Sequence, residues 1–402
     1  MKRWLRALFE GRPTWMNALM VFCGFMAFIY LPWDFLIKPV AGDEEVWFGL
    51  RFHGWGAKLT EPFHWAIYAA GWYGFRNMKG WMWPWAAVYA GQVALGMLLW
   101  NLVYVGGFGG VVLGLASFAP FAALTYALWQ ADNLFGAARP PLRERYGEWA
   151  LVTGASAGIG AEFARAFARD GLSVVLTARR AEKLRELASE LEKTYHVATR
   201  VVTADLADPA GPARVADAVA DLEIAVLVNN AGFGASGRFE KLDPERLREM
   251  VQLNCIAPVL LTHRLLAGMR ARGRGAIVIT GSVAGRQGLP LHGVYSATKA
   301  FDLLFGESLA VELEDHGIDV LVLEPGSTET EFQQVANETP HAGESAAEVV
   351  AVALEALGRH HSVISGWMNW LRANAAQRLA PRRLVTSAAE ELMAAQTPEH
   401  LR

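Results

Sequence analysis

The feature that most constrains this chain is a glycine-rich turn between an apolar segment and a helical one. Residues 149–153 have the composition of a buried strand, three glycines follow, and a helical stretch covers 161–169. In such a unit the first glycine permits a tight turn, the second lets the backbone approach a pyrophosphate, and the third lets helix and strand pack closely. The pattern predicts an α/β fold, a Rossmann-type doubly wound parallel sheet that binds a dinucleotide. The candidate cofactor residues in this turn are Gly154, Ser156, Gly158, Ile159 and Gly160.

The end of the next expected strand, 173–177, indicates which dinucleotide binds. An NAD-selective site usually carries an acidic side chain there, which holds the ribose 2′-hydroxyl. This chain carries Arg179 and Arg180 instead, and guanidinium groups bind phosphate in bidentate fashion. The pair favours NADP(H), unless Arg180 is only a solvated residue that opens the following helix. A third strand ends in Asp205 and Leu206, which we expect beside the adenine ring.

A tyrosine and a lysine supply candidate acid–base chemistry. Tyr295 and Lys299 lie four residues apart at the start of an expected helix, so they share one helix face. A phenol with an ordinary pKa near ~10 is a weak acid and a weak base at neutral pH, but an adjacent ammonium lowers that pKa. Ser282, at the end of the expected strand 276–280, can donate a hydrogen bond to the same substrate oxygen. The set predicts proton exchange with that oxygen while a hydride moves to or from a nicotinamide.

Together with Asn229-Asn230-Ala231-Gly232, these motifs resemble the short-chain dehydrogenase/reductase family over residues 149–366. The resemblance implies a catalytic set of Asn254, Ser282, Tyr295 and Lys299, in which the asparagine holds a water beside the lysine. It also implies that later segments contact the cofactor. Those candidates are Asn229, Ala231, Gly232, Tyr295, Lys299, Pro325, Gly326 and Thr328, with Thr330 as a second donor to the nicotinamide.

In this family the substrate-binding residues come from three variable segments, here 233–239, 283–294 and 333–343. Glu324, directly before the Pro-Gly pair, departs slightly from the family pattern. The resemblance also implies assembly into a homodimer or tetramer. The large apolar side chains of these loops either form an apolar pocket or only pack the loops: Phe233, Phe239, Leu289, Leu291 and Phe332.

Residues 1–138 differ in kind from the rest. Twelve of the fifteen tryptophans precede residue 130, whereas charged residues are concentrated after it. The second of the long apolar stretches contains Lys58, Glu61 and His64, so it either crosses a bilayer or lies in its interface. For the first stretch, 16–37, the alternative is a cleaved signal peptide, but the stretch is longer than the apolar region of a signal peptide. The composition predicts a helical membrane region of about four spans, at 16–37, 57–75, 81–104 and 108–129.

Basic residues predict the orientation of these spans. Four spans place Arg76 and Lys79 on the same side as the basic N-terminus and the arginines that follow residue 138, which satisfies the positive-inside bias. We therefore expect an integral membrane protein, in the inner (cytoplasmic) membrane if the protein is bacterial, with a cytoplasmic catalytic domain. His53, Glu61 and His64 either mark a functional pocket at membrane depth or lie at the membrane surface.

The remaining segments are a linker over 139–147, the catalytic domain over 148–366 and a helical tail over 367–402. In the tail, Trp367, Trp370 and Leu371 stand beside arginines, as in a helix that touches a membrane surface. A lid over the substrate or a dimer contact would use the same residues.

The sequence thus predicts a membrane-anchored NADP(H)-dependent oxidoreductase that interconverts a carbonyl and an alcohol on an apolar or lipid-like small molecule. In the alternative, the membrane region is a sensing or transport module, and the other domain is a nucleotide-occupied regulator. A net charge of −3 without a basic stripe gives no reason to expect nucleic acid. We expect no metal, because Cys23 and Cys255 are too few for a cysteine site and His360-His361 have no third ligand nearby.

Overall fold

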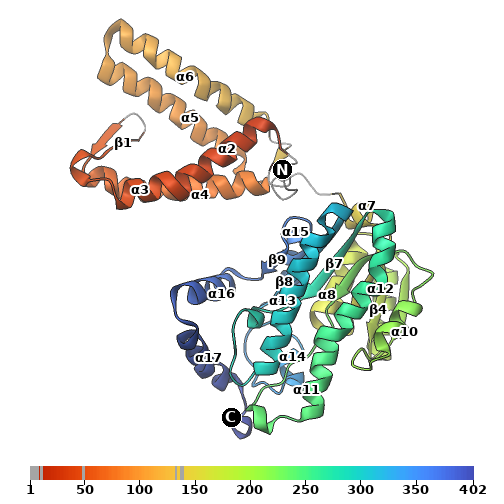
Figure 1. Ribbon diagram of the computed structural model, residues 1–402. Helices are drawn as coiled ribbons and strands as arrows, with labels where there is room; N and C mark the ends of the chain where they lie inside the picture. Colours follow the sequence, from red (N-terminus) through yellow and green to blue (C-terminus); the bar gives the residue numbers. More distant parts are fainter. Residues whose placement is uncertain (1–8, 10–11, 48–49, 132–133, 136–139) are drawn as a thin grey trace. The chain divides into compact units, whose positions relative to one another are not determined.

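The computed structural model describes residue 9 and residues 12–47, 50–131, 134–135 and 140–402, except the side chains of residues 375–379. The chain divides into two compact units, Met1–Arg139 and Pro140–Arg402 (Figure 1). The second unit contains the glycine-rich turn, and the first contains the long apolar stretches. The two units are therefore described one after the other.

The second unit is built on a seven-stranded sheet in which all neighbouring strands run parallel. Its strand order is β5-β4-β3-β6-β7-β8-β9, so the direction of winding reverses between β3 and β6. Ligands of doubly wound sheets bind at that reversal. The predicted Rossmann-type fold is confirmed. The strands are β3 (Trp149–Thr153), β4 (Ser173–Ala178), β5 (Thr199–Thr203), β6 (Ile224–Asn229), β7 (Gly275–Thr280), β8 (Ile318–Glu324) and β9 (Ser362–Ile364).

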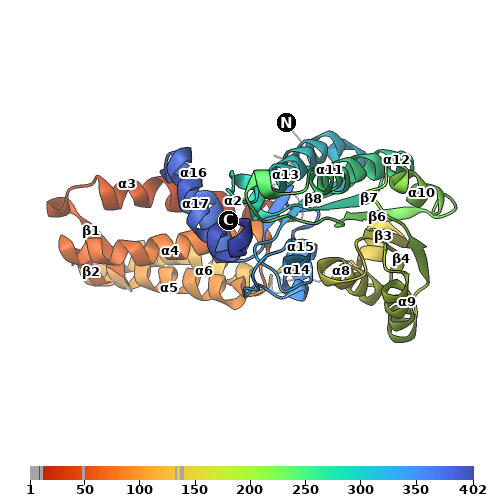
Figure 2. The same cartoon turned by 90° about the horizontal axis from the view of Figure 1, so that it is seen from below.

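Helices cover both faces of this sheet (Figures 1 and 2). In β3, Ala150 and Val152 join one apolar core while Leu151 joins the other, because successive side chains of a strand point to opposite faces. Burial on both faces explains the nearly continuous apolar runs of the strands. One layer contains α8 (Gly158–Arg169), α9 (Ala181–Tyr195) and α15 (Ala346–Ala356), and the other contains α10 (Gly211–Asp217), α12 (Ala257–Arg272) and α13 (Gly293–Leu313).

The segment predicted as a linker contains a short helix, α7 (Leu142–Tyr146). Leu142 and Tyr146 are four residues apart and are both buried in the core of the second unit. The Tyr146 hydroxyl also donates to Asp319 at 2.6 Å. Residues 142–146 therefore pack as part of the second unit. The other short elements are η5 (Phe239–Lys241), α11 (Pro244–Val251), η6 (Gln252–Ile256), η7 (Val283–Arg286), η8 (Glu314–His316), α14 (Phe332–Val335), α16 (Trp367–Leu379), α17 (Arg382–Gln396) and η9 (Glu399–Leu401).

The first unit consists of long helices and one small hairpin. Among the described residues of this unit, Thr14–Leu36, Met82–Val105 and Gly107–Trp129 are helical, long and apolar enough to cross a membrane. α4 does not meet this measure, so the second predicted span stays a prediction. Pro244–Arg272 also meets it, although this helix packs on the sheet of the second unit. The elements are α2 (Thr14–Phe25), η1 (Met26–Tyr30), α3 (Leu31–Leu36), η2 (Val40–Gly42), β1 (Glu44–Trp47), β2 (Leu50–His53), α4 (Trp55–Asn77), α5 (Met82–Trp100), η3 (Asn101–Val105) and α6 (Gly107–Trp129).

The charged residues at the start of α4 belong to a buried ionic cluster. Lys58 donates to Glu61 at 3.1 Å and lies 3.1 Å from Asp43. Lys38 lies 3.0 Å from Asp34 and 2.5 Å from Asp43. Mutual pairing is what makes burial of these charges tolerable in an apolar unit. The sequence pointed to Lys58 and Glu61 but not to Asp34, Lys38 and Asp43, because these three come from α3 and the loop that follows it.

The two histidines named with Glu61 lie elsewhere. His64 stacks on Trp47 with ring centroids 4.0 Å apart and lies 3.3 Å from Glu45. His53 is exposed and lies 3.2 Å from Glu44. Both histidines therefore pair with the β1 strand, and neither joins the buried cluster.

One threonine connects the loops on either side of the winding reversal. Thr153, at the end of β3, is buried, and its hydroxyl accepts hydrogen bonds from the backbone N–H groups of Asn230 at 2.8 Å and Ala231 at 3.0 Å. The same hydroxyl donates to the carbonyl of Val228 at 3.1 Å. Three backbone groups beside β6 therefore depend on one side chain of β3.

Thr153→Val should destabilise the second unit by about 2–4 kcal/mol, because the isosteric side chain leaves two backbone N–H groups without an acceptor. Calorimetry of the full chain should show the second unit unfolding several degrees lower. Thr203→Val, the same change at an exposed strand end, is the control and should leave that temperature unchanged. Equal transitions in the two variants would contradict the role given to Thr153.

Candidate active site

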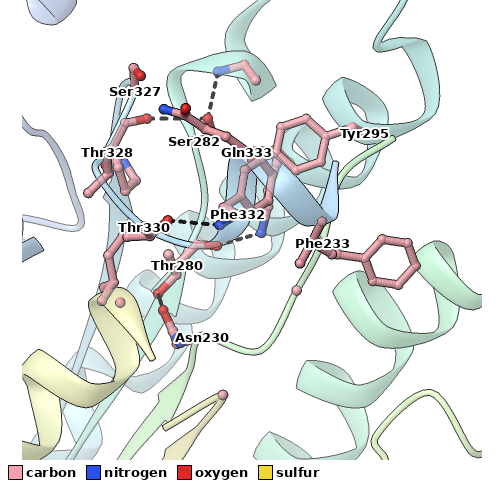
Figure 3. A pocket seen from close by; sticks show the side chains of 18 of the residues that line it. Asn230, Phe233, Thr280, Ser282, Tyr295, Ser327, Thr328, Thr330, Phe332 and Gln333 are labelled. Carbon is pink, nitrogen blue, oxygen red and sulfur yellow. Dashed lines mark hydrogen bonds between the residues drawn. The ribbon is translucent and has the colours of Figure 1, made fainter. Parts of the chain in front are cut away.

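A cavity of about 680 Å³ lies at the carboxyl ends of the parallel strands (Figure 3). Its walls come from the loops after six of the strands and from α13, α16 and α17. This is the edge at which ligands of doubly wound sheets bind. The catalytic and cofactor candidates named from the sequence all line it, except for Gly160, Asn229 and Asn254.

The glycine turn packs directly against the loop after β6. A Cβ at Gly154, whose φ is +67°, would lie 2.9 Å from the Cα of Ala231. A Cβ at Gly160 would lie 2.4 Å from the carbonyl oxygen of Gly154. Gly158 has a φ of +56°, a conformation that glycine adopts without strain. The turn therefore needs glycine, and it presents the N-terminus of α8 to the cavity, where an anion is stabilised.

Both arginines after β4 line the cavity, but they have different partners. Arg179 is largely exposed and lies 3.9 Å from Asp205. Arg180 reaches back to the hydroxyl of Ser156 at 2.9 Å and pairs with Glu331 at 2.6 Å. Arg180 is therefore more than a solvated residue at the start of α9. The sequence missed Glu331, which also pairs with Lys183 at 2.6 Å, because it comes from the distant loop after β8.

The two asparagines after β6 divide their roles. Asn229, the last residue of the strand, is buried and donates to Thr262 at 3.0 Å, away from the cavity. Asn230 lines the cavity, donates to the carbonyl of Thr153 at 3.0 Å and accepts from Thr280 at 3.3 Å. The structure thus does not bring Asn229 to the site. Side chains alternate in direction along an extended backbone, and this rule could have identified Asn230 as the asparagine that faces the cavity.

Ser282, Tyr295 and Lys299 converge on the cavity. Ser282 follows β7, and its hydroxyl belongs to the cavity that Tyr295 and Lys299 also line. The same hydroxyl accepts from the backbone N–H of Ala284 at 3.1 Å and donates to the carbonyl of Pro325 at 3.3 Å. Tyr295 and Lys299 share one face of α13, as predicted from their spacing. The three groups can therefore act on one substrate oxygen.

Asn254 lies behind these three residues, in the one-turn π-helix η6 between α11 and α12. Its amide accepts from the backbone N–H of Phe233 at 3.1 Å and donates to that residue's carbonyl at 3.0 Å and to Thr298 at 3.0 Å. A Cβ on Gly232 would lie 3.0 Å from the Asn254 carbonyl oxygen and 3.7 Å from the Lys299 ammonium. Asn254 therefore joins the loop after β6 to α13, close to the lysine. One-turn π-helical segments such as η6 often occur at functional sites.

The electrostatics around Tyr295 include a carboxylate that the sequence analysis missed. Burial raises the pKa of Tyr295, and Lys299 and Ser282 lower it only in part. The Lys299 ammonium donates to the Thr280 carbonyl at 2.7 Å and to Asp302 at 3.0 Å. Asp302 is almost fully buried, and burial raises the pKa of its carboxyl. Its position three residues after Lys299 was a readable signal, because such residues are neighbours on a helix.

Apolar residues expected from the variable loops line the cavity, with exceptions. The ring of Phe332 lies 5.4 Å from that of Tyr295 (Figure 3). Phe233 and Leu289 also line the cavity, but the ring of Phe233 points away from the other two rings (Figure 3). Leu291 does not line the cavity, and Phe239 is 72% exposed. Several of the other lining residues are polar or come from the tail: His292, Gln333, Glu338, His341, Asn369, Arg372, Leu392, Met393 and Gln396.

The unusual Glu324 has a structural explanation. It is fully buried at the end of β8 and forms two hydrogen bonds with the Arg286 guanidinium, at 2.5 and 2.6 Å. Arg286 belongs to η7, which follows Ser282. The pair therefore joins the loop that carries Ser282 to the Pro-Gly segment. Because the two residues lie in elements that are 38 positions apart in the sequence, sequence spacing could not pair them.

Comparisons with known proteins agree with this site. A family model described as short chain dehydrogenase matches residues 148–341. A 7β-hydroxysteroid dehydrogenase of Collinsella aerofaciens is 34% identical over 237 residues, which cover 57% of this chain and 89% of that protein. A very-long-chain 3-oxoacyl-CoA reductase of Homo sapiens is 34% identical over 221 residues, which cover 54% of this chain and 71% of that protein.

Solved structures give the same result. A 7β-hydroxysteroid dehydrogenase structure superposes with a TM-score of 0.59 at 31% identity and covers 62% of this chain and 99% of the other. A short-chain dehydrogenase from Sphingobium yanoikuyae in complex with NADPH superposes with a TM-score of 0.52 at 32% identity and covers 63% of this chain and 99% of the other. All four relatives thus match the second unit, which alone is long enough to account for the coverage.

Asp302→Asn should move the pH dependence of turnover. The Asp302 carboxylate raises the pKa of Tyr295, so its removal lowers that pKa, while Lys299 continues to favour the phenolate. In alcohol oxidation the phenolate is the reactive form, so the rising limb of kcat/KM should shift to lower pH.

The matched control for this experiment is Glu312→Gln, which removes an exposed carboxylate from the same helix and should leave the profile in place. If Asp302→Asn lowers turnover at every pH without moving the inflection, Asp302 has only a structural role.

Proposed function

Because this chain belongs to the short-chain dehydrogenase/reductase family, we propose that it is an NADP(H)-dependent enzyme that interconverts a carbonyl and an alcohol on an apolar, lipid-like substrate. Its first unit anchors it in a membrane. The observation that carries the proposal is that Ser282, Tyr295 and Lys299 line the same cavity as the glycine turn and the aromatic residues Phe233 and Phe332.

The residues of the cradle suit a nicotinamide dinucleotide phosphate. The side-chain-free surface at Gly154, Gly158 and Gly160 leaves room for a pyrophosphate at the N-terminus of α8. Arg179 and Arg180 would hold the 2′-phosphate, and Asp205 would lie at the adenine. When bound, the cofactor supplies or accepts the hydride at its nicotinamide ring. The Pro325-Gly326 segment and Thr328 line the part of the cavity beside Ser282, where that ring would lie.

The protein side chains move the proton. In reduction, the Tyr295 hydroxyl donates a proton to the oxygen that becomes the alcohol, and in oxidation the phenolate takes it back. Ser282 donates a hydrogen bond to the same oxygen and stabilises the charge that develops on it. Lys299 stays cationic beside Tyr295 and offsets the rise in pKa that burial causes. Asp302 and the Thr280 carbonyl hold the lysine in place.

Two observations support a large apolar substrate. Phe233, Leu289, Phe332 and, from the tail, Met393 line the cavity. Two relatives of this chain are, by their names, a 7β-hydroxysteroid dehydrogenase and a very-long-chain 3-oxoacyl-CoA reductase. A substrate of this kind partitions into lipid, and the first unit supplies three helices that are long and apolar enough to reside there. The orientation proposed from the basic residues places the cavity on the cytoplasmic side.

Tyr295→Phe should lower turnover by a factor of about 10²–10⁴, because it removes the proton donor and keeps the ring. Oxidation of NADPH by the full chain in lipid nanodiscs is measured against a panel of 3-oxoacyl thioesters, oxosteroids and short water-soluble ketones. Tyr195→Phe, the same change on α9, should behave like the parent protein. If no ketone is reduced faster than by Tyr295→Phe, the proposed function is wrong.

Arg180→Ser should raise KM for NADPH by on the order of tenfold, because a charge-assisted hydrogen bond to the 2′-phosphate is lost. KM for NADH should change little. Glu331→Gln should act in the opposite direction, since Glu331 competes with the phosphate for Arg180. Arg185→Ser, on the exposed side of α9, serves as the control. An equal rise in KM for both cofactors would contradict NADP(H) selectivity at this position.

A further inference from the structure

Helix α16 has two faces with different surroundings. Asn369, Arg372 and Ala373 line the cavity, at the spacing that places residues on one side of a helix. Asn369 donates to the Ser365 carbonyl at 2.9 Å, and its amide lies 2.3 Å from where a Cβ on Gly326 would stand. This face of α16 therefore packs on the Pro-Gly segment, beside the residues that act on the substrate.

The opposite face of α16 is apolar and exposed. Trp367 is 74% exposed, Trp370 is 55% exposed and Leu371 is 43% exposed. Trp367, Trp370 and Leu371 are three or four residues apart and therefore share one face of the helix, on the side opposite to Asn369, Arg372 and Ala373. Leu384, at the start of α17, is 61% exposed as well. We refer to Trp367, Trp370, Leu371 and Leu384 as the tail surface.

The charge of this segment is one-sided. Residues 367–389, which hold the whole tail surface, contain four arginines and neither aspartate nor glutamate, in a chain whose net charge is −3; Glu390 and Glu391 follow only in the second half of α17, about two turns beyond Leu384. Arg382 and Arg383 are exposed beside Leu384. Tryptophan at the boundary between an apolar surface and water, next to arginine, is the composition that binds the interface of an anionic bilayer.

The helical pair is fastened to the cavity rim at its far end. The Thr397 hydroxyl, after α17, hydrogen-bonds Ser236 at 2.6 Å, and both residues are fully buried. The backbone N–H of Thr339 donates to the Gln396 carbonyl at 2.8 Å. Between these ends, Leu392 is 55% exposed and also lines the cavity, so it stands at the rim. α16 and α17 thus form a wall of the cavity; its cavity side is mixed, with Asn369, Arg372 and Gln396 beside Leu392 and Met393, and its outer side carries the tail surface.

We propose that the tail surface docks into the interface of an anionic lipid bilayer, and that the apolar substrate enters the cavity from the lipid past α16 and Leu392. The part of this inference that concerns the substrate rests on the proposed function. A lipid surface is favoured over a second protein chain because the arginines are not matched by any acidic residue within the segment. An exposed tryptophan ring is poorly solvated by water, whereas in the headgroup layer of a bilayer the ring contacts apolar groups and its N–H donates to polar groups.

Docking is tested by labelling the full chain in nanodiscs. Cys23 and Cys255 are both buried, and burial raises the pKa of the Cys255 thiol to about 11, so a new exposed cysteine is labelled selectively. Leu371→Cys carries a fluorophore on the tail surface, and Lys193→Cys carries it on exposed α9 as the control. Nitroxide-bearing lipids should quench the label at 371 severalfold more than the label at 193. Iodide in the water should do the reverse.

Lipid composition gives a second measurement. Quenching at 371 should be stronger in nanodiscs that mix phosphatidylglycerol with phosphatidylcholine than in phosphatidylcholine alone. The double variant Arg382→Gln/Arg383→Gln should remove that difference. A label at 371 that is open to iodide like the control overturns the proposal. A label shielded from both quenchers assigns the tail surface to a protein contact and overturns it as well.

Entry of the substrate is tested by kinetics. Trp367→Glu/Trp370→Glu should raise KM for a bilayer-dissolved ketone by on the order of tenfold, because charges in the interface weaken docking. KM for NADPH and turnover of a short water-soluble ketone should stay unchanged. The matched control is Phe239→Glu, an exposed aromatic residue outside the cavity. An unchanged KM for the bilayer-dissolved ketone overturns the entry route.

The two failures are distinguishable. If no ketone is turned over but lipid still quenches the label at 371, the proposed function fails and docking stands. If ketones are reduced in solution but the label at 371 behaves like that at 193, the proposed function stands and docking fails.

Discussion

The close packing of the glycine turn against the loop after β6 is the constraint on which the rest of the site depends. The backbone of Ala231 lies where a Cβ on Gly154 would stand, and Thr153 accepts hydrogen bonds from the N–H groups of Asn230 and Ala231. Because this contact lies at the reversal of winding, it fixes where α8 points its N-terminus and where the loop carrying Gly232 runs. That loop in turn holds Asn254, and through it α13 with Tyr295 and Lys299.

The chemistry of the site is set by competition between burial and charge. Desolvation raises the pKa of the Tyr295 phenol, so the lysine is needed to keep the phenolate accessible. A lone buried ammonium would itself be costly, and Asp302 supplies the counter-charge at 3.0 Å. The same compromise occurs in the first unit, where Lys38 and Lys58 pair with three buried carboxylates. In both places the pairing partners of a buried charge are as important as the charge itself.

The sequence predicted what depends on residues close together along the chain. The glycine turn, the Tyr295–Lys299 spacing and the strands of the sheet follow local rules, and the structure has them where the sequence indicated. It failed where the partners come from elements that are far apart in the sequence. Arg180 meets Glu331, Arg286 meets Glu324, and Lys58 meets Asp43 across distances that no periodicity encodes. The placement of Asn229 at the site failed for another reason. Side chains of successive residues in an extended backbone point to opposite sides, so Asn229 points into the core and Asn230 points into the cavity.

The proposed docking of the tail offers a physical reason for the large first unit. A substrate that dissolves in lipid is scarce in water, so an enzyme that draws it from water is limited by encounter. An anchor that holds the cavity near the bilayer raises the effective concentration of the substrate without any new contact in the site. Anchoring by itself brings the cavity near lipid but does not turn the entrance of the cavity towards it. An exposed Trp and Arg surface on the same helix that lines the cavity would supply that orientation, since the face that enters the headgroup layer is then tied to the wall that meets the substrate.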